Sequence, residues 1–201
     1  AWFSCLDMRS SYHQVAMDEK DAEKTAFICH RGSFLYRTMP MGLRNSGATF
    51  QRLMDMVMAG LTFEVCLVYL DDIVVFSRTL EEHLDSLEMV LKRLVDTGLK
   101  LKPSKCRLLQ RRIVFLGHVV TEDGVSTDPA KTEQIKKWPR PASFREVRGF
   151  LGLCGYYRKF IDRYAELAAP LTTMLKKGHK FCWTDEGEVA FEKLKAVLTS
   201  P

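Results

Sequence analysis

The sequence predicts an α+β fold in which an antiparallel sheet packs on helices and a mainly helical segment follows. Up to about residue 125, short apolar segments rich in β-branched residues alternate with amphipathic ones. From Asp128 onward, the start signals and the apolar spacing are those of helices alone. Neighbouring strands that are mixed with helices in this order are typical of an α+β layer rather than of a parallel sheet.

The composition supports a globular protein with a core. The 201 residues are 46% hydrophobic and 27% charged, which excludes a disordered chain or a coiled coil. The longest apolar stretch, Met56–Phe63, is much shorter than the ~18 residues of a membrane helix. The first residues lack the basic and apolar regions of a secretory signal. No contact with a membrane is therefore expected.

Four strands are predicted in the first 40 residues. Phe3–Asp7 is apolar, and Tyr12–Met17 alternates polar with apolar side chains, as a half-buried strand does. Lys24–His30 and Phe34–Met39 are predicted to pair through a turn at residues 31–33.

A helix and a tight hairpin are predicted next. Ser46 can cap a helix that runs to about Ala59 with one apolar face. Two β-branched strands, Val65–Leu70 and Ile73–Ser77, are separated only by Asp71-Asp72. This spacing predicts a two-residue hairpin with both carboxylates at its tip.

The clearest helix signal follows this hairpin. Thr79 and Glu82 form a capping box, leucines recur at helical spacing, and Gly98 ends the helix. Ile113–Thr121 is the last predicted strand, and it turns at Asp123-Gly124.

The remaining signals are those of helix starts. Pro129 occupies a first-turn position, Ser143 and Glu146 form a second capping box, and Thr184 can cap a final helix. We therefore expect a domain boundary near Ser126.

The charge distribution predicts a surface that binds a polyanion. The net charge is 30 − 25 = +5. Residues 61–100 carry 4 basic and 8 acidic side chains, whereas residues 101–160 carry 13 and 5. A basic block after an acidic one suggests a nucleic-acid surface beside a cation site. A solvated lysine-rich face is the alternative.

The six cysteines lie at least 24 positions apart and form no C-x-x-C pair. This spacing favours neither a zinc site nor a disulfide framework. Free thiols fit an intracellular, reducing location.

Three carboxylates carry the predicted chemistry. Asp71 and Asp72 repel each other in apolar surroundings unless a cation lies beside them, and hard cations such as Mg²⁺ prefer carboxylate oxygens. If the strand that ends at Asp7 pairs beside this hairpin, all three converge. Such a set can hold two Mg²⁺ ions ~3.5–4 Å apart and catalyse phosphoryl transfer. A solvent-exposed Asp-Asp turn and an Asp7 strand cap are the alternatives.

Several short motifs occur in a fixed order along the chain. They are Phe3-Ser4-x-Leu6-Asp7, Lys24-Thr25-Ala26-Phe27, Met39-Pro40-x-Gly42, Thr49-Phe50-Gln51, Tyr69-Leu70-Asp71-Asp72, Phe115-Leu116-Gly117-His118 and Phe150-Leu151-Gly152-Leu153. Together they resemble the reverse transcriptase, an RNA-directed DNA polymerase, of gypsy-like long-terminal-repeat retrotransposons and retrovirus-like polyproteins. The resemblance covers essentially the whole chain.

The resemblance implies a right-hand polymerase. Residues 1–125 would be the palm with partial fingers, residues 126–180 a helical thumb, and residues 181–201 the start of a connection leading to ribonuclease H. The reaction would be template-directed transfer of a deoxynucleotide from its triphosphate to a primer 3′-hydroxyl, with two Mg²⁺ ions, or Mn²⁺ in their place.

The expected partners are an RNA or DNA template with a DNA primer, together with ribonuclease H and integrase in the same polyprotein. The implied location is the cytoplasm, in a virus-like particle, or the nucleus. The chain is expected to be a fragment that lacks the upstream fingers and is by itself weakly active or inactive. A degenerate or co-opted copy that binds nucleic acid or serves as a scaffold, without polymerase activity, is the alternative.

The resemblance also assigns roles to residues. Asp7, Asp71 and Asp72 would be the metal ligands, assisted by the backbone carbonyl of Met8. Lys105 would protonate the departing pyrophosphate; the alternative is a solvated lysine after a turn.

Further residues would bind the substrates. Tyr12 would stack under the incoming sugar, unless it is a core aromatic on a strand, and Met41 and Gly42 would lie beside the nucleotide. The primer and template would contact Tyr69, Phe115, Leu116, Gly117 and His118. The phosphates would be gripped by Lys131, Lys136, Lys137, Arg140, Arg145 and Arg148.

Overall fold

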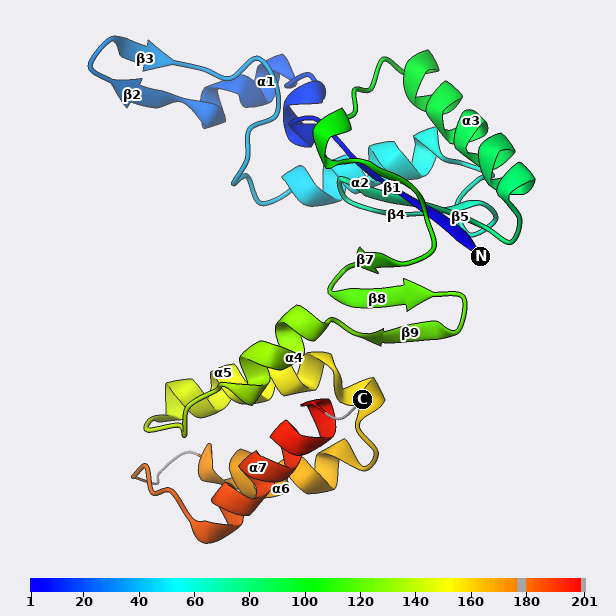
Figure 1. Ribbon diagram of the computed structural model, residues 1–201. Helices are drawn as coiled ribbons and strands as arrows, with labels where there is room; N and C mark the ends of the chain where they lie inside the picture. The colour runs from blue at the N-terminus through cyan, green and yellow to red at the C-terminus, as the bar shows by residue number, and fades with distance from the viewer. Residues whose placement is uncertain (177–179, 200–201) are drawn as a thin grey trace. The chain divides into compact units, whose positions relative to one another are not determined.

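The structure, a computed structural model, describes residues 1–176 and 180–199 (Figure 1). The chain divides into two compact units. Unit 1 comprises residues 1–115 and 121–123, and unit 2 comprises residues 116–120 and 124–201. None of the helices in the described ranges is both long and apolar enough to cross a bilayer.

Unit 1 is built on a four-stranded antiparallel sheet. The order of its strands is β4-β5-β1-β6, so the first strand of the chain lies inside the sheet. The strands are β4 (Cys66–Tyr69), β5 (Asp72–Ser77), β1 (Trp2–Asp7) and β6 (Arg107–Gln110). The predicted strands at residues 3–7, 65–70 and 73–77 are therefore confirmed.

Two amphipathic helices, α2 (Ser46–Val57) and α3 (Leu80–Asp96), pack against this sheet. Their apolar stripes and the sheet form one core, in which Phe50 and Val90 are fully buried. The predicted capping box begins α3, because the Thr79 hydroxyl accepts from Glu82 N–H and the Glu82 carboxylate accepts from Thr79 N–H. The predicted helix at residue 46 begins one residue earlier than expected, with Asn45 as its N-cap.

Successive side chains of a strand point to opposite faces of the sheet, so core residues and site residues can alternate along β1. Leu6 belongs to the core shared with α2 and α3, so Asp7, its neighbour, lies on the other face of the sheet. Asp72 lies opposite Asp7 in the register, and Ile73 lies opposite Leu6. The apolar alternation therefore directs both acids away from the helices.

The prediction of a strand at Tyr12–Met17 is wrong. Residues Ser11–Gln14 form a 3₁₀ helix, which follows Ser10 with a φ of +48°. The Gln14 side chain donates to the carbonyl of Lys100 and accepts from its N–H, at 3.0 and 2.7 Å. Tyr12 is an apolar position of the segment although it lies outside a strand, because its ring packs edge-on against Phe50 of α2.

The predicted strands at residues 24–30 and 34–39 are mostly irregular. Only β2 (Phe27–Cys29) and β3 (Gly32–Phe34) pair, so the hairpin is shorter than predicted. Short helical turns, α1 (Glu19–Ala22) and Glu23–Thr25, precede it.

Unit 2 is mainly helical, as predicted. Its helices are α4 (Pro129–Lys136), α5 (Phe144–Tyr156), α6 (Tyr164–Met174) and α7 (Asp185–Thr199). Its core is rich in aromatic side chains, with Phe150 and Phe191 in contact at a ring-centroid separation of 4.6 Å.

The expected caps of unit 2 are present. The Ser143 hydroxyl accepts from Glu146 N–H at the start of α5, and the Thr184 hydroxyl accepts from Gly187 N–H at the start of α7. The Glu146 carboxylate accepts from Ala142 N–H and from the Ser143 hydroxyl, so the second box is displaced by one residue from its expected form.

The single strand predicted at Ile113–Thr121 is two strands. β7 (Ile113–Phe115) and β8 (His118–Thr121) are separated by Leu116-Gly117, and β9 (Gly124–Thr127) follows the predicted turn. Leu116 and Gly117 have φ values of +47° and +70°, which end the extended backbone.

Candidate active site

The centre of the site is a pair of acids on neighbouring strands. Asp7 ends β1 and Asp72 begins β5, and they are cross-strand partners. The Cβ atoms of such partners lie roughly 4.5–5.5 Å apart on the same face of the sheet. The pairing of β1 beside the hairpin, on which the three-carboxylate hypothesis depends, is therefore present.

Asp71 lies at the turn between β4 and β5. Tyr69 pairs with Asp72, so the two turn residues are Leu70 and Asp71, not Asp71 and Asp72 as predicted. The carbonyl of Asp71 accepts from the N–H of Met8 at 3.2 Å, which ties the turn to the end of β1. The Met8 side chain is buried in the unit 1 core.

The turn itself is supported by a glutamine of α2. Leu70 has a φ of +53°, an uncommon conformation for a residue with a Cβ. Its N–H donates to Gln51 Oε1 at 2.6 Å, while Gln51 Nε2 donates to Asp55 Oδ1 at 2.8 Å. Gln51 therefore fixes the turn that carries Asp71, although the sequence reasoning gave it no role.

Lys105 lies against the acids. Its Nζ is 3.0 Å from Asp7 Oδ2, an ion pair between a largely exposed ammonium and a mostly buried carboxylate. The hydrogen bond to Asp7 raises the pKa of Lys105, and the negative charges of Asp7, Asp71 and Asp72 act in the same direction. Burial raises the pKa of Asp72 most, followed by repulsion from Asp71 and Asp7, and Lys105 opposes these effects.

The carboxylates fit a divalent cation by their chemistry. In the part of the chain that the structure describes, no three His, Cys, Asp or Glu side chains form a set ready to hold a metal ion. The cation beside Asp7 is instead the Lys105 ammonium. Burial is the main cause of the raised pKa of Asp72, and repulsion from Asp71 and Asp7 adds to it; a divalent cation would relieve that repulsion.

A pocket of about 230 Å³ opens beside these acids. Asp7, Asp72 and Lys105 line it, together with Arg107 of β6 and Phe115 of β7. Arg107 adds a second cation to this pocket, and the sequence reasoning missed it. The reason is that β6 itself was not predicted.

The predicted nucleotide-binding residues are less closely grouped. Tyr12 is partly buried, and its hydroxyl would lie 3.8 Å from a Cβ at Gly47 of α2. Met41 is 66% exposed, and Gly42 has a φ of +90° in the loop before α2. Tyr12 thus packs on the α2 helix that follows this loop.

The predicted primer-binding residues lie in two places. Tyr69 is half-exposed at the end of β4, opposite Asp72. Phe115 ends β7, and His118 begins β8 after the Leu116–Gly117 turn. The His118 ring stacks on Tyr156 with a centroid separation of 5.1 Å.

The predicted phosphate-gripping side chains are all exposed on and around α4 and α5. Two of them have acidic partners: Lys137 pairs with Glu133 at 3.0 Å, and Arg140 pairs with Glu188 of α7 at 3.3 Å. The guanidinium of Arg140 also lies over the Trp183 ring. Arg140 therefore joins two elements of unit 2 as well as contributing charge.

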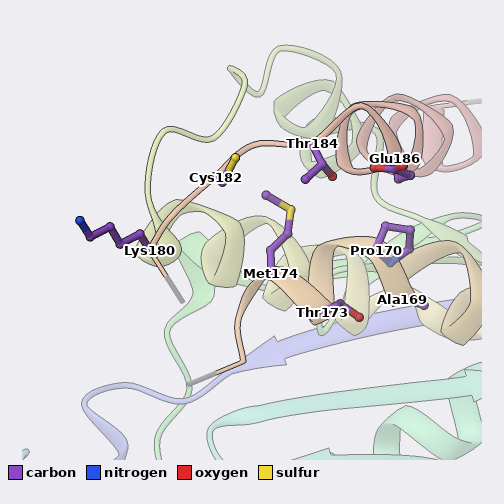
Figure 2. A pocket seen from close by; sticks show the side chains of 8 residues that line it. All are labelled: Ala169, Pro170, Thr173, Met174, Lys180, Cys182, Thr184 and Glu186. Carbon is purple, nitrogen blue, oxygen red and sulfur yellow. The ribbon is translucent and has the colours of Figure 1, made fainter. Parts of the chain in front are cut away.

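A larger pocket of about 570 Å³ lies between α6 and α7 (Figure 2). Pro170 and Met174 of α6 line it, together with Cys182. Its described lining is mainly apolar, and none of the predicted site residues belongs to it.

The architecture of unit 1 is that of an α+β polymerase palm, an antiparallel sheet that carries acids on one face and helices on the other. Residues 1–120 match the family described as reverse transcriptase (RNA-dependent DNA polymerase). The chain belongs to this family, as the sequence motifs predicted.

Similar proteins are retrotransposon polyproteins. The chain is 47% identical over 199 residues to the Retrovirus-related Pol polyprotein from transposon 297 of Drosophila melanogaster, covering 98% of this chain and 19% of that protein. It is 38% identical over 175 residues to the corresponding polyprotein of transposon gypsy from the same organism, covering 87% and 17%. The chain thus spans less than a fifth of these relatives.

Two solved structures have the same fold. A foamy viral protease-reverse transcriptase in complex with double-stranded DNA matches with a TM-score of 0.91 and 26% identity, over 98% of this chain and 35% of that chain. The enzyme in complex with an RNA/DNA hybrid matches with a TM-score of 0.87 and 26% identity, over 98% and 27%. Reverse transcriptases in general use divalent metal ions.

Proposed function

We propose that this chain is the polymerase part of a longer Pol polyprotein and catalyses RNA-directed DNA synthesis. The observation that carries the proposal is the register of β1 and β5, which places Asp7 opposite Asp72 beside the Asp71 turn. The proposed substrates are deoxynucleoside triphosphates and a primer on an RNA or DNA template. The likeness to foamy viral enzymes in complex with double-stranded DNA and with an RNA/DNA hybrid supports these partners.

The acids would align the reacting groups. Bound at Asp7, Asp71 and Asp72, with help from the Met8 carbonyl, two Mg²⁺ ions or Mn²⁺ in their place would activate the 3′-hydroxyl and stabilise the leaving oxyanion. Lys105, which lies at hydrogen-bond distance from Asp7, would give a proton to the departing pyrophosphate. Positioning and charge neutralisation supply most of the catalysis in phosphoryl transfer.

The parts of a right hand are proposed along the chain. Residues 1–125 would serve as palm with partial fingers, 126–180 as thumb and 181–201 as the start of the connection; residues 177–179, 200 and 201 lie outside the described residues. The helices of unit 2 would hold duplex phosphates through exposed basic side chains, which contact the backbone without reading sequence. Ribonuclease H and integrase are proposed to lie in the same polyprotein, which would act inside the cell.

The nucleotide would lie beside the second-motif loop. Met41 and Gly42 are exposed there, and Tyr12 packs on α2, which follows the loop. The primer end would lie on Tyr69 and on residues 115–118.

Primer extension by the longer Pol polyprotein that contains these residues tests the proposal, because the 201 residues alone are expected to be weakly active or inactive. Asp71→Asn is the inactive variant and Asp85→Asn, an exposed acid on α3, is the matched control. Extension by the wild type and by Asp85→Asn, lost in Asp71→Asn, is the expected result. Binding of a primer–template without any extension would favour a degenerate or scaffold copy instead. Extension that Asp71→Asn retains in full would contradict the proposed site.

A further inference from the structure

The turn before β8 has a backbone conformation that its sequence does not favour. Leu116 and Gly117 both lie in the left-handed region, with φ values of +47° and +70°. Two-residue turns with two positive φ values usually carry Asn-Gly, since a Cβ at the first position is unfavourable. A residue in such a conformation persists only where its surroundings hold it there.

Two tyrosines at the end of α5 hold this turn. The Tyr157 hydroxyl donates to the carbonyl of Gly117 at 2.8 Å, and the Tyr156 hydroxyl donates to the carbonyl of Leu116. A Cβ at Gly117 would lie 3.5 Å and 3.6 Å from these two hydroxyl oxygens. Each of the two residues with positive φ therefore has its carbonyl bound by one tyrosine.

The tyrosine rings are themselves held in place. Tyr157 is 1% exposed and belongs to the core of unit 2, and its ring lies edge-on to that of Tyr156 at 5.0 Å. His118, the residue after the turn, stacks flat on Tyr156 with an interplanar angle of 11°. It also meets Tyr157 edge-on at 5.5 Å. The turn is thus fixed by hydrogen bonds on its carbonyls and by ring contacts on the next side chain.

We propose that Tyr156 and Tyr157 are positioning residues that fix the Leu116–Gly117 turn for binding of the primer strand. This inference rests on the proposed function, in which the same turn contacts the primer. Packing alone would need only aromatic rings at these two positions. The two hydroxyls are directed instead at the turn, which a purely packing role does not explain.

The test removes the hydroxyls and keeps the rings. Tyr156→Phe, Tyr157→Phe and the double variant are compared with wild type in two measurements on the 201-residue chain. One is amide hydrogen exchange at residues 116–118, and the other is affinity for a fluorescent primer–template duplex. The matched control is Tyr164→Phe, whose hydroxyl donates to the carbonyl of Leu151 at 3.3 Å within unit 2 and not to the turn.

We expect the double variant to exchange these amides about tenfold faster and to bind the duplex about tenfold more weakly, the effect of losing one or two hydrogen bonds. Tyr164→Phe should change neither quantity at the turn. Adding Leu116→Asn, which tolerates positive φ, should restore slow exchange in the double variant. Such a rescue would show that the faster exchange comes from the unfavourable conformation of the turn and not from a general loss of stability.

Each of the other possible outcomes would contradict either the positioning role of the tyrosines or the proposed function. If wild type binds the duplex and the double variant binds equally well, the positioning role is wrong while the proposed function stands. Unchanged exchange at residues 116–118 would likewise overturn it. If wild type itself does not bind the duplex, the proposed function fails, and the inference that rests on it fails as well.

Discussion

The two units hold their candidate functional residues by different means. In unit 1, Asp7 and Asp72 are placed by backbone pairing, because β1 and β5 fix them as cross-strand partners. In unit 2, the turn at Leu116–Gly117 is placed by side chains, through two tyrosine hydroxyls. Asp7 and Asp72 need only the correct register, whereas the Leu116–Gly117 turn depends on particular polar atoms. An isosteric substitution of Asp7 or Asp72 should therefore change the reaction rate and leave the fold intact. Replacement of Tyr156 or Tyr157 by Phe should instead change the conformation of the turn.

The largest effect that distinguishes the units is expected at Asp72. Asp72→Asn should lower primer extension by at least about 10²-fold if Asp72 is a metal ligand as proposed, because a bound metal supplies several kcal/mol of transition-state stabilisation. Its melting temperature should stay the same or rise, since burial, and after it repulsion by Asp71 and Asp7, disfavours the charged carboxylate and raises its pKa. Extension rates and thermal melting of the same samples check both statements. A large loss of stability would show that the acid has a structural role instead.

Truncation of one buried aromatic residue in each core should show whether each unit is destabilised only by a change in its own core. Phe50 and Phe150 are both fully buried, the first in the mixed aliphatic core of unit 1 and the second in the aromatic core of unit 2. Truncation of either to Ala should cost about 3–5 kcal/mol. Hydrogen exchange should then report loss of protection in α2 for Phe50→Ala and in α7 for Phe150→Ala. Equal losses in both helices for one variant would argue against two separate cores.

A smaller effect is expected at Gln51. Gln51→Met keeps the length of the side chain but removes the acceptor for the Leu70 N–H, which it binds at 2.6 Å. The loss should be about 1 kcal/mol, because the Leu70 N–H is only partly buried and would be left without its partner. Denaturant unfolding measures it, with Gln134→Met on the exposed surface of α4 as control. No difference between the two variants would mean that water replaces the glutamine.

The smallest expected effect is a pH dependence that belongs to unit 1. His83 of α3 is fully buried, and its Nε2 lies 2.8 Å from Ser4 Oγ of β1. Burial holds the pKa of His83 below its ordinary value of 6.5. The unfolded chain therefore binds this proton more readily, so stability is complete above about pH 6.5 and decreases as the pH falls from there toward the folded value.

Denaturant midpoints between pH 5.5 and 7.5 measure this dependence. His83→Gln should reduce the slope, because the uncharged amide does not titrate in this range; the part that remains belongs to groups such as His118, whose pKa burial also lowers. A slope that stays the same in the variant would assign the dependence to another group.

The sequence predicted correctly those helices and strands that short-range signals, such as caps and turns, specify and that tertiary packing does not alter. The Thr79–Glu82 box, the Thr184 cap and the β4–β5 hairpin are of this kind. Strand β6 was missed because it pairs irregularly with β1. Leu109 has a φ of +54°, and its N–H donates to the Ser4 hydroxyl, so no regular alternation remains to be recognised.

The candidate site was predictable in part for the same reason. The acids follow apolar strands, and the cross-strand position of Asp7 and Asp72 needed only one assumption about strand pairing. Gln51 and the two tyrosines act through hydrogen bonds to backbone atoms of distant segments. The spacing of residues along the chain does not predict such hydrogen bonds, so they can be identified only in the structure.

The cross-strand pairing of Asp7 with Asp72 also makes this protein sensitive to length. Side chains alternate along a strand, so removal of one codon from β1 would turn Asp7 toward α2 and α3 and bring an apolar side chain to its place. A residue lost from the exposed hairpin of β2 and β3 would have no such consequence. Among decaying copies of such a gene, loss of a single codon from β1 should therefore abolish DNA synthesis as surely as replacement of the acid itself.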